Sequence, residues 1–96
     1  MTDREMLELA ARAVNGGSWH PLTHNAPNGD WNPRDDDGDA LRLAVYLEFE
    51  IDITSTGVAV RTRCGLKVLV NKTEEPDLCA AARLAITRAA AEIGRQ

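Results

Sequence analysis

The chain has 96 residues, of which 44% are hydrophobic and 27% are charged, and its net charge is −4 at pH 7. This length predicts a single domain over residues 1–96, and the composition is ordinary for a globular protein. No apolar run approaches the ~20 residues of a membrane-spanning helix. The first residues carry acids in place of the apolar core of a signal peptide, so we expect a cytoplasmic protein.

The first expected element is a helix over residues 3–15. Thr2 and Glu5 have the spacing of a capping box, in which each residue satisfies a backbone N–H group at the start of a helix. Apolar residues then recur at helical spacing, and Gly16-Gly17 ends the pattern.

A long loop is expected over residues 16–35. It contains three prolines and a turn-forming Asn-Gly pair, which together disfavour regular structure. Loops of this length within a compact domain are usually functional, packed down or disordered. Trp19 and Trp31 concentrate half of the aromatic side chains of the chain in this loop.

A second helix is expected over about residues 36–47, with Asp36 or Asp37 as its N-cap. Helical spacing predicts its buried stripe as Ala40, Leu41, Ala44, Val45 and Leu47.

The apolar period then changes from that of a helix to that of a strand. FEIDITST, GVAVRTRC and GLKVLVNK alternate apolar and polar residues, with tight turns between them. This predicts an antiparallel meander with one apolar face. The opposite face is expected to carry charges of both signs, which either pair across the strands or bind a partner: Glu50, Asp52, Arg61, Arg63 and Lys67.

The last expected element is a helix that starts at Glu75-Pro76-Asp77 and ends at Gly94. The predicted fold class is therefore α+β, a three-stranded antiparallel meander packed with three helices in the order ααβββα. Because the charges of the sheet would be costly to bury, we expect the helices mostly on one face.

The aspartates of DWNPRDDDGD suggest either a cation site or the start of a helix. With Gly38 at the sixth position of an EF-hand loop, Pro33 and Ala44 occupy positions that need ligands. A standard calcium loop is therefore not expected, and capping is the favoured interpretation. A divalent-metal-binding protein or enzyme remains an alternative, with ligands from Asp30, Asp35, Asp36, Asp37 and one of His20 and His24.

No catalytic constellation is apparent, so we expect no enzyme and no cofactor. Cys64 and Cys79 have no family signature around them and are expected to be reduced thiols. The order αβββα is also that of double-stranded-RNA-binding domains, whose final helix begins with basic residues. Here that helix begins with acids, so nucleic-acid binding through Arg61, Arg63 and Lys67 is a further alternative.

Three stretches together resemble a known family: TDREMLELAARA, WNPRDDDGDALRLAV and ARLAITRAAAEIGR. They are similar to small proteins of tailed bacteriophages and prophages described as a phage α-β-α sandwich domain. The resemblance spans nearly the whole chain, and the WNP…DDGDALRLAV stretch is its most specific part. It implies a phage or prophage origin, the host bacterial cytoplasm, and helices on both faces of the sheet. It implies no catalytic residues.

The sequence therefore predicts a small non-enzymatic phage accessory protein that binds a host or phage protein. Tryptophan is enriched at the energetic centres of interfaces, and two tryptophans lie here beside a carboxylate cluster. The alternative, which is favoured for Trp31, is that these side chains anchor the loop in the core. The candidate partner-binding residues are Trp19, Trp31, Asp30, Asp35, Asp36, Arg61, Arg63 and Lys67.

Overall fold

The computed structural model describes residues 2–15 and 31–96. In chain order its elements are α1 (Asp3–Asn15), α2 (Asp37–Tyr46), β1 (Glu50–Thr54), β2 (Gly57–Arg61), β3 (Lys67–Asn71), the 3-10 turn η2 (Lys72–Glu74) and α3 (Leu78–Arg95). The α+β class and the order ααβββα are confirmed. The expectations for residues 16–30, Trp19 and Asp30 among them, lie outside the described residues.

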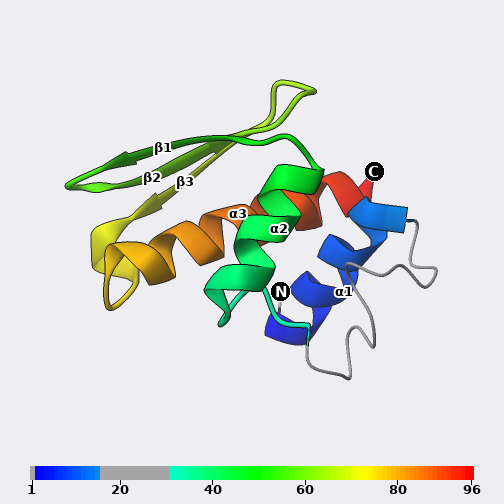
Figure 1. Ribbon diagram of the computed structural model, residues 1–96, viewed down its shortest axis with the longest axis horizontal. Coiled ribbons are helices and arrows are strands. Elements are labelled where there is room, and N and C mark those ends of the chain that lie inside the picture. The colour runs from blue at the N-terminus through cyan, green and yellow to red at the C-terminus, as the bar shows by residue number, and fades with distance from the viewer. Residues whose placement is uncertain (1, 16–30) are drawn as a thin grey trace.

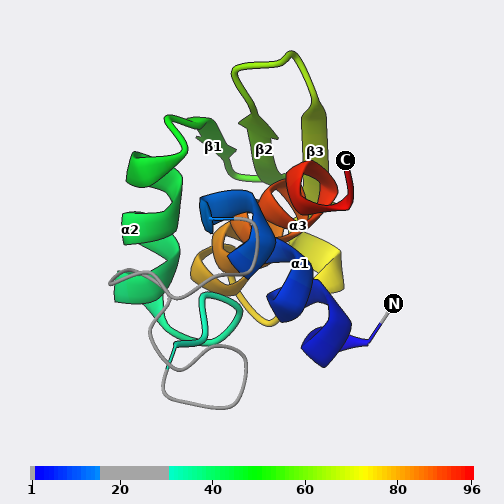
Figure 2. The ribbon, with the colours of Figure 1, turned by 90° about the vertical axis from the view of Figure 1, so that its right-hand side faces the viewer.

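The three strands form one antiparallel sheet in the order β1-β2-β3. Two tight connections set the register, which places Ile51 opposite Val60 and Val60 opposite Val68. Figure 1 shows all three helices on the same side of this sheet, and Figure 2 shows β1 at the edge nearest α2. The prediction of helices mostly on one face is confirmed, and none of the described helices lies on the opposite face, where the family resemblance implied a second layer.

Helix α3 lies at the centre of the molecule, between the sheet and the helices α1 and α2. Its buried positions are mostly alanines, whose small side chains let neighbouring elements approach closely. Gly94 was expected to end this helix, but the helix continues through it to Arg95. The physical reason is packing, because the backbone of α1 at Leu9 occupies the space where a side chain at Gly94 would stand.

The buried face of α2 differs from the predicted stripe. Ala40 and Ala44 are buried as expected, and Leu43, which was not predicted, is buried with them. Leu41 and Val45 were expected to be inside, but they are 60% and 67% exposed. Among the described elements, α2 packs chiefly on α3 through a narrow face, and none of the others covers its remaining apolar side chains.

The sheet buries its central strand more completely than its first one. Val58 and Val60 of β2 are buried against α3, whereas Ile53 of β1 is 58% exposed although it points to the same side. The apolar face predicted from alternation is therefore real, but the helices do not fully cover it at β1.

Candidate functional site

Trp31 is a core residue. Its side chain is 1% exposed, among the largest fully buried side chains of the described residues. The prediction that Trp31 binds a partner is therefore wrong, because almost none of its indole surface is exposed. Its Nε1 atom has no hydrogen-bond partner in the described part of the chain.

The aspartates before α2 build the start of that helix. Asp36 is the N-cap, and its carboxylate accepts from the backbone N–H of Asp39 at 2.8 Å. Asp39 is buried and accepts from the N–H of Asn32 at 2.8 Å and from Arg42 at 2.7 Å. Asp35 accepts from the side-chain amide of Asn32 at 3.1 Å. These carboxylates fold the WNP turn back onto the first turn of α2.

Asp37 joins the same segment to α3 through Arg83. The Arg83 guanidinium donates to Asp37 Oδ1 at 2.5 Å and to the carbonyl oxygen of Arg34 at 3.2 Å. The hydrogen bond that Arg83 donates to Asp37 raises the pKa of Arg83, so this cation stays fully charged. Arg34 itself pairs with Glu75 at 2.7 Å, just before α3. Two ion pairs thus hold the beginnings of α2 and α3 together.

Each of these carboxylates therefore faces a donor of its own protein. Among residues 2–15 and 31–96, no group of three or more His, Cys, Asp or Glu side chains could hold a metal ion. Asp30, His20 and His24, the other ligands of the metal alternative, lie outside these ranges. The helix-capping interpretation of Asp36 is confirmed.

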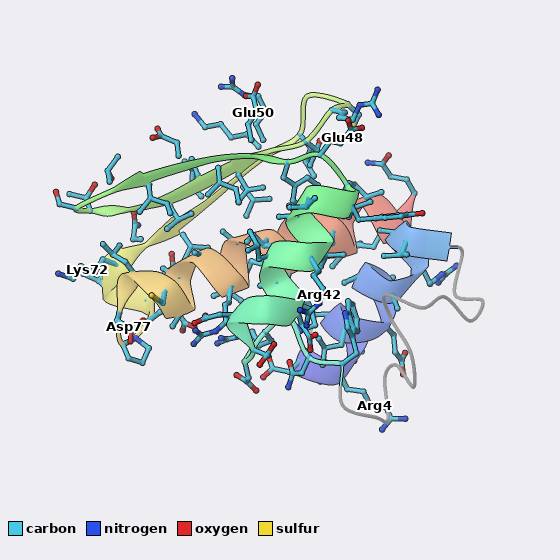
Figure 3. The ribbon with its side chains drawn as sticks, viewed as in Figure 1. Arg4, Arg42, Glu48, Glu50, Lys72 and Asp77 are labelled. Atoms are coloured by element: carbon cyan, nitrogen blue, oxygen red, sulfur yellow. The ribbon has the colours of Figure 1, made fainter. Side chains whose placement is uncertain are left out.

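The sheet face away from the helices carries mixed charge. Figure 3 shows the Glu50 side chain on this face, where it lies 3.5 Å from Arg61. Arg63, expected on the second strand, lies instead in the turn after β2 and pairs with Glu48 at 2.5 Å. Lys67 lies opposite Arg61 in the register. Two of the three basic residues of the nucleic-acid alternative, Arg61 and Arg63, therefore pair with acids.

An apolar groove of about 280 Å³ lies between β1, α2 and α3. The charged pair Asp37–Arg83 forms part of its wall, and its other lining residues are apolar or small: Ala40, Leu41, Ile51, Ile53, Leu78, Cys79, Ala82 and Ile86. Leu41, Ile53 and Cys79 are exposed within it. A hollow with apolar walls and few polar groups has the character of a binding site.

The sequence pattern identified the apolar residues of this groove but predicted that they belong to the core. Leu41 and Ile53 have the spacing of buried positions, and only the arrangement of α2 beside the edge strand leaves them uncovered. The composition of α2 did indicate exposed apolar surface, because this helix carries more apolar residues than one contact with α3 can bury.

Comparison with known proteins identifies no relative. The chain matches no family model, no curated protein and no solved structure. None of the helices in the described ranges combines the length and the hydrophobicity that a membrane crossing requires.

Proposed function

We propose that this protein is a non-enzymatic protein-binding module whose binding site is the groove between β1, α2 and α3. The observation that carries the proposal is the exposure of Leu41 and Ile53 at an apolar hollow beside an open strand edge. Exposed apolar surface gathered in one concave place marks binding sites more often than scattered exposed side chains do.

Most of the other candidate residues already bind groups within the chain, which supports the groove as the binding site. Asp35 and Asp36 bind groups of the α2 start, and Arg61 and Arg63 pair with neighbouring acids. The groove side chains Leu41 and Ile53, by contrast, have large exposed apolar areas. The resemblance to tailed-phage proteins fits an accessory role in which the partner is a phage or host protein in the bacterial cytoplasm.

Affinity capture with matched variants tests the proposal. The chain is used as bait in a lysate of the cells that produce it, beside Leu41→Lys and Ile53→Lys. Val45→Lys and Leu69→Lys are the controls, because these residues are equally exposed but do not line the groove. A specific partner is expected with the wild type and with both controls, and its yield should fall with both groove variants. Capture that is absent, or equal for all five baits, contradicts the proposal.

A further inference from the structure

Among the described residues, no other strand pairs with the outer edge of β1. Lys72 N–H donates to the carbonyl oxygen of Thr56 at 2.9 Å. This bond makes Gly57–Asn71 a non-hydrogen-bonded pair, so the backbone groups of Gly57 point toward β1. Gly57 lies opposite Thr54, and hydrogen-bonded pairs alternate with non-hydrogen-bonded pairs along an antiparallel ladder. Ile53, one residue before Thr54, and Ile51 therefore belong to non-hydrogen-bonded pairs. The N–H and C=O groups of Ile51 and Ile53 therefore point away from β2.

The same two residues line the apolar groove with their side chains. In a strand, side chains stand perpendicular to the backbone hydrogen-bonding direction. The edge of β1 thus combines open backbone groups with an apolar hollow directly beneath it. A strand added beside β1 would continue the sheet and direct every second side chain into the groove.

The opposite edge of the sheet lacks this combination. Next to β3 lies a hollow lined by charged and apolar residues, among them Lys67, Arg88 and Glu92. At the end of β3, the N–H of Asn71 already donates to Glu74 at 2.9 Å. Lysines and covered ends are common ways to keep an edge strand from pairing. Of the two edges of the sheet, β1 is therefore the one that is open to a partner.

Charge on the other face of β1 specifies the partner further. Glu50 lies on the face away from the helices (Figure 3). Asp52, two residues further along β1, shares this face, and both alternate with the groove-lining isoleucines. Glu50 has Arg61 as a neighbour, whereas Asp52 lies opposite Ala59 and has no ion pair among the described residues. Residues of an added strand on this face would stand beside these carboxylates, where opposite charge stabilises the pair and like charge destabilises it.

Taking these observations together, we propose that β1 binds an extended segment of another protein as a fourth strand, with apolar residues that alternate with lysine or arginine. The apolar residues occupy the groove, and the basic residues lie beside Glu50 and Asp52. This inference rests on the proposed protein-binding function and adds the conformation and the chemistry of the partner. A second copy of this chain is the wrong occupant, because pairing through β1 would bring the same carboxylates of both copies onto one face.

The test uses the full chain and a nine-residue peptide in which valine or isoleucine alternates with lysine or arginine. Amide hydrogen exchange, followed by NMR, reports strand pairing residue by residue. Exchange at Ile51 and Ile53 should slow by about tenfold or more with the peptide, because their N–H groups gain acceptors. Exchange at Asp52 should change less, since its N–H already faces β2.

Two peptide controls separate strand addition from apolar binding alone. A peptide methylated on alternate backbone nitrogens, so that it cannot pair with β1, should neither bind nor slow exchange. Protection of Cys79, which lines the groove, from alkylation reports occupancy, and Cys64 outside the groove serves as the internal reference. Equal protection of Cys79 by the methylated peptide overturns strand addition but leaves the groove as a binding site.

Charge reversal tests the remaining part of the inference. A peptide with glutamate in place of its basic residues should bind about tenfold or more weakly, and Asp52→Lys should reverse this preference. Glu92→Lys makes the same change in net charge next to β3 and should leave the preference as it is. The inference is wrong if no alternating peptide binds at millimolar concentration, or if the chain forms a dimer that Ile53→Lys disperses. Neither result contradicts the proposed protein-binding function, which the affinity capture tests separately.

Discussion

Gly94 of α3 lies against the carbonyl oxygen of Leu9 in α1, with no room for a side chain between the two helices. A Cβ atom at Gly94 would stand well inside the 3.0 Å that real Cβ atoms keep from backbone atoms. Because backbone cannot move aside as a side chain can, Gly94→Ala should lower the free energy of unfolding by about 2–4 kcal/mol. This loss should appear although alanine favours helices by about 1 kcal/mol over glycine.

Urea denaturation of Gly94→Ala measures the loss, and Gly38→Ala is its matched control. A Cβ at Gly38 would meet only the ends of the Arg42 and Asp36 side chains, at 3.2 Å, and these can shift. The control should change stability by less than about 1 kcal/mol. Equal losses for the two variants would contradict the close approach of α1 and α3.

The aspartates before α2 should differ in their contributions to stability. Asp39→Ala leaves the part-buried N–H of Asn32 without this acceptor and should cost about 1–3 kcal/mol. Asp36→Ala removes the N-cap and should cost about 1 kcal/mol. Asp35→Ala loses an exposed hydrogen bond and should cost less than about 0.5 kcal/mol.

Denaturant titration of the three variants checks this order. The same samples with added calcium or magnesium should melt at unchanged temperature, because the carboxylates of this segment already bind protein donors. A largest effect at Asp35, or a rise in Tm with either cation, would favour the divalent-metal alternative instead.

Trp31→Ala should be among the most destabilising single substitutions in the chain. It removes a fully buried indole from the core, which costs about 3–5 kcal/mol in comparable cases. Loss of binding by this variant would therefore report unfolding and not a contact with a partner. Circular dichroism during thermal unfolding checks the effect, with Leu69→Ala, at an exposed position, expected to stay within about 0.5 kcal/mol of wild type.

Glu48 stands at a backbone position that favours glycine. Its φ of 57° lies in the left-handed region, and it follows the C-cap of α2. The N–H groups of Glu48 and Phe49 donate to Val45 and Ala44, the pattern of a Schellman motif. Glu48→Gly should therefore raise the free energy of unfolding by about 0.5–1 kcal/mol, despite the loss of the exposed pair with Arg63.

The matched control for Glu48→Gly is Glu50→Gly in strand β1. Glycine there gains no conformational advantage and should cost about 0.5–1 kcal/mol through backbone entropy. Chemical denaturation of both variants measures whether each substitution raises or lowers the free energy of unfolding. Destabilisation by both substitutions would mean that the left-handed conformation of Glu48 carries little strain.

Cys64 should react with alkylating reagents at lower pH than an ordinary thiol. The hydrogen bond with the Thr62 hydroxyl, at 3.1 Å, lowers the pKa of Cys64, and a backbone hydrogen bond from Leu66 adds to this effect. Since the folded pKa is lowered, the thiolate stabilises the folded state above the unfolded pKa. This contribution is lost as the pH falls through the folded pKa.

The alkylation rate of Cys64 as a function of pH, measured in a Cys79→Ser background, tests this shift. Thr62→Val removes the hydroxyl and should move the midpoint upward, toward the ordinary thiol value. A midpoint that Thr62→Val leaves unchanged would show that this hydroxyl does not act on the thiol.

Local signals in the sequence predicted the helices and strands better than they predicted how these elements pack against one another. Thr2 does accept from the N–H of Glu5 at 3.1 Å, and Asp36 does cap α2, because capping depends on residues a few positions apart. The end of α2 was placed only approximately, since the left-handed residue there is Glu48 and not the usual glycine. Gly94 carried the usual stop signal, but close packing with α1 explains it instead.

The candidate site was the part that the sequence predicted least. Periodicity identifies the apolar positions of α2 and β1, and it cannot tell which of them a neighbouring layer covers. Leu41 and Ile53 were therefore assigned to the core, whereas the candidate partner-binding residues included Trp31, which is buried. Coverage depends on how α2 lies beside the sheet edge, which is a long-range property of the fold.

The central position of α3 also bears on how the chain folds during synthesis. Helices α1 and α2 and the strands β2 and β3 all pack on this one helix, which follows them in the chain. Before it leaves the ribosome, the earlier elements have no common surface on which to bury their apolar faces. We therefore expect the core to form in one late step after residues 78–95 emerge, with the preceding segments exposed until then.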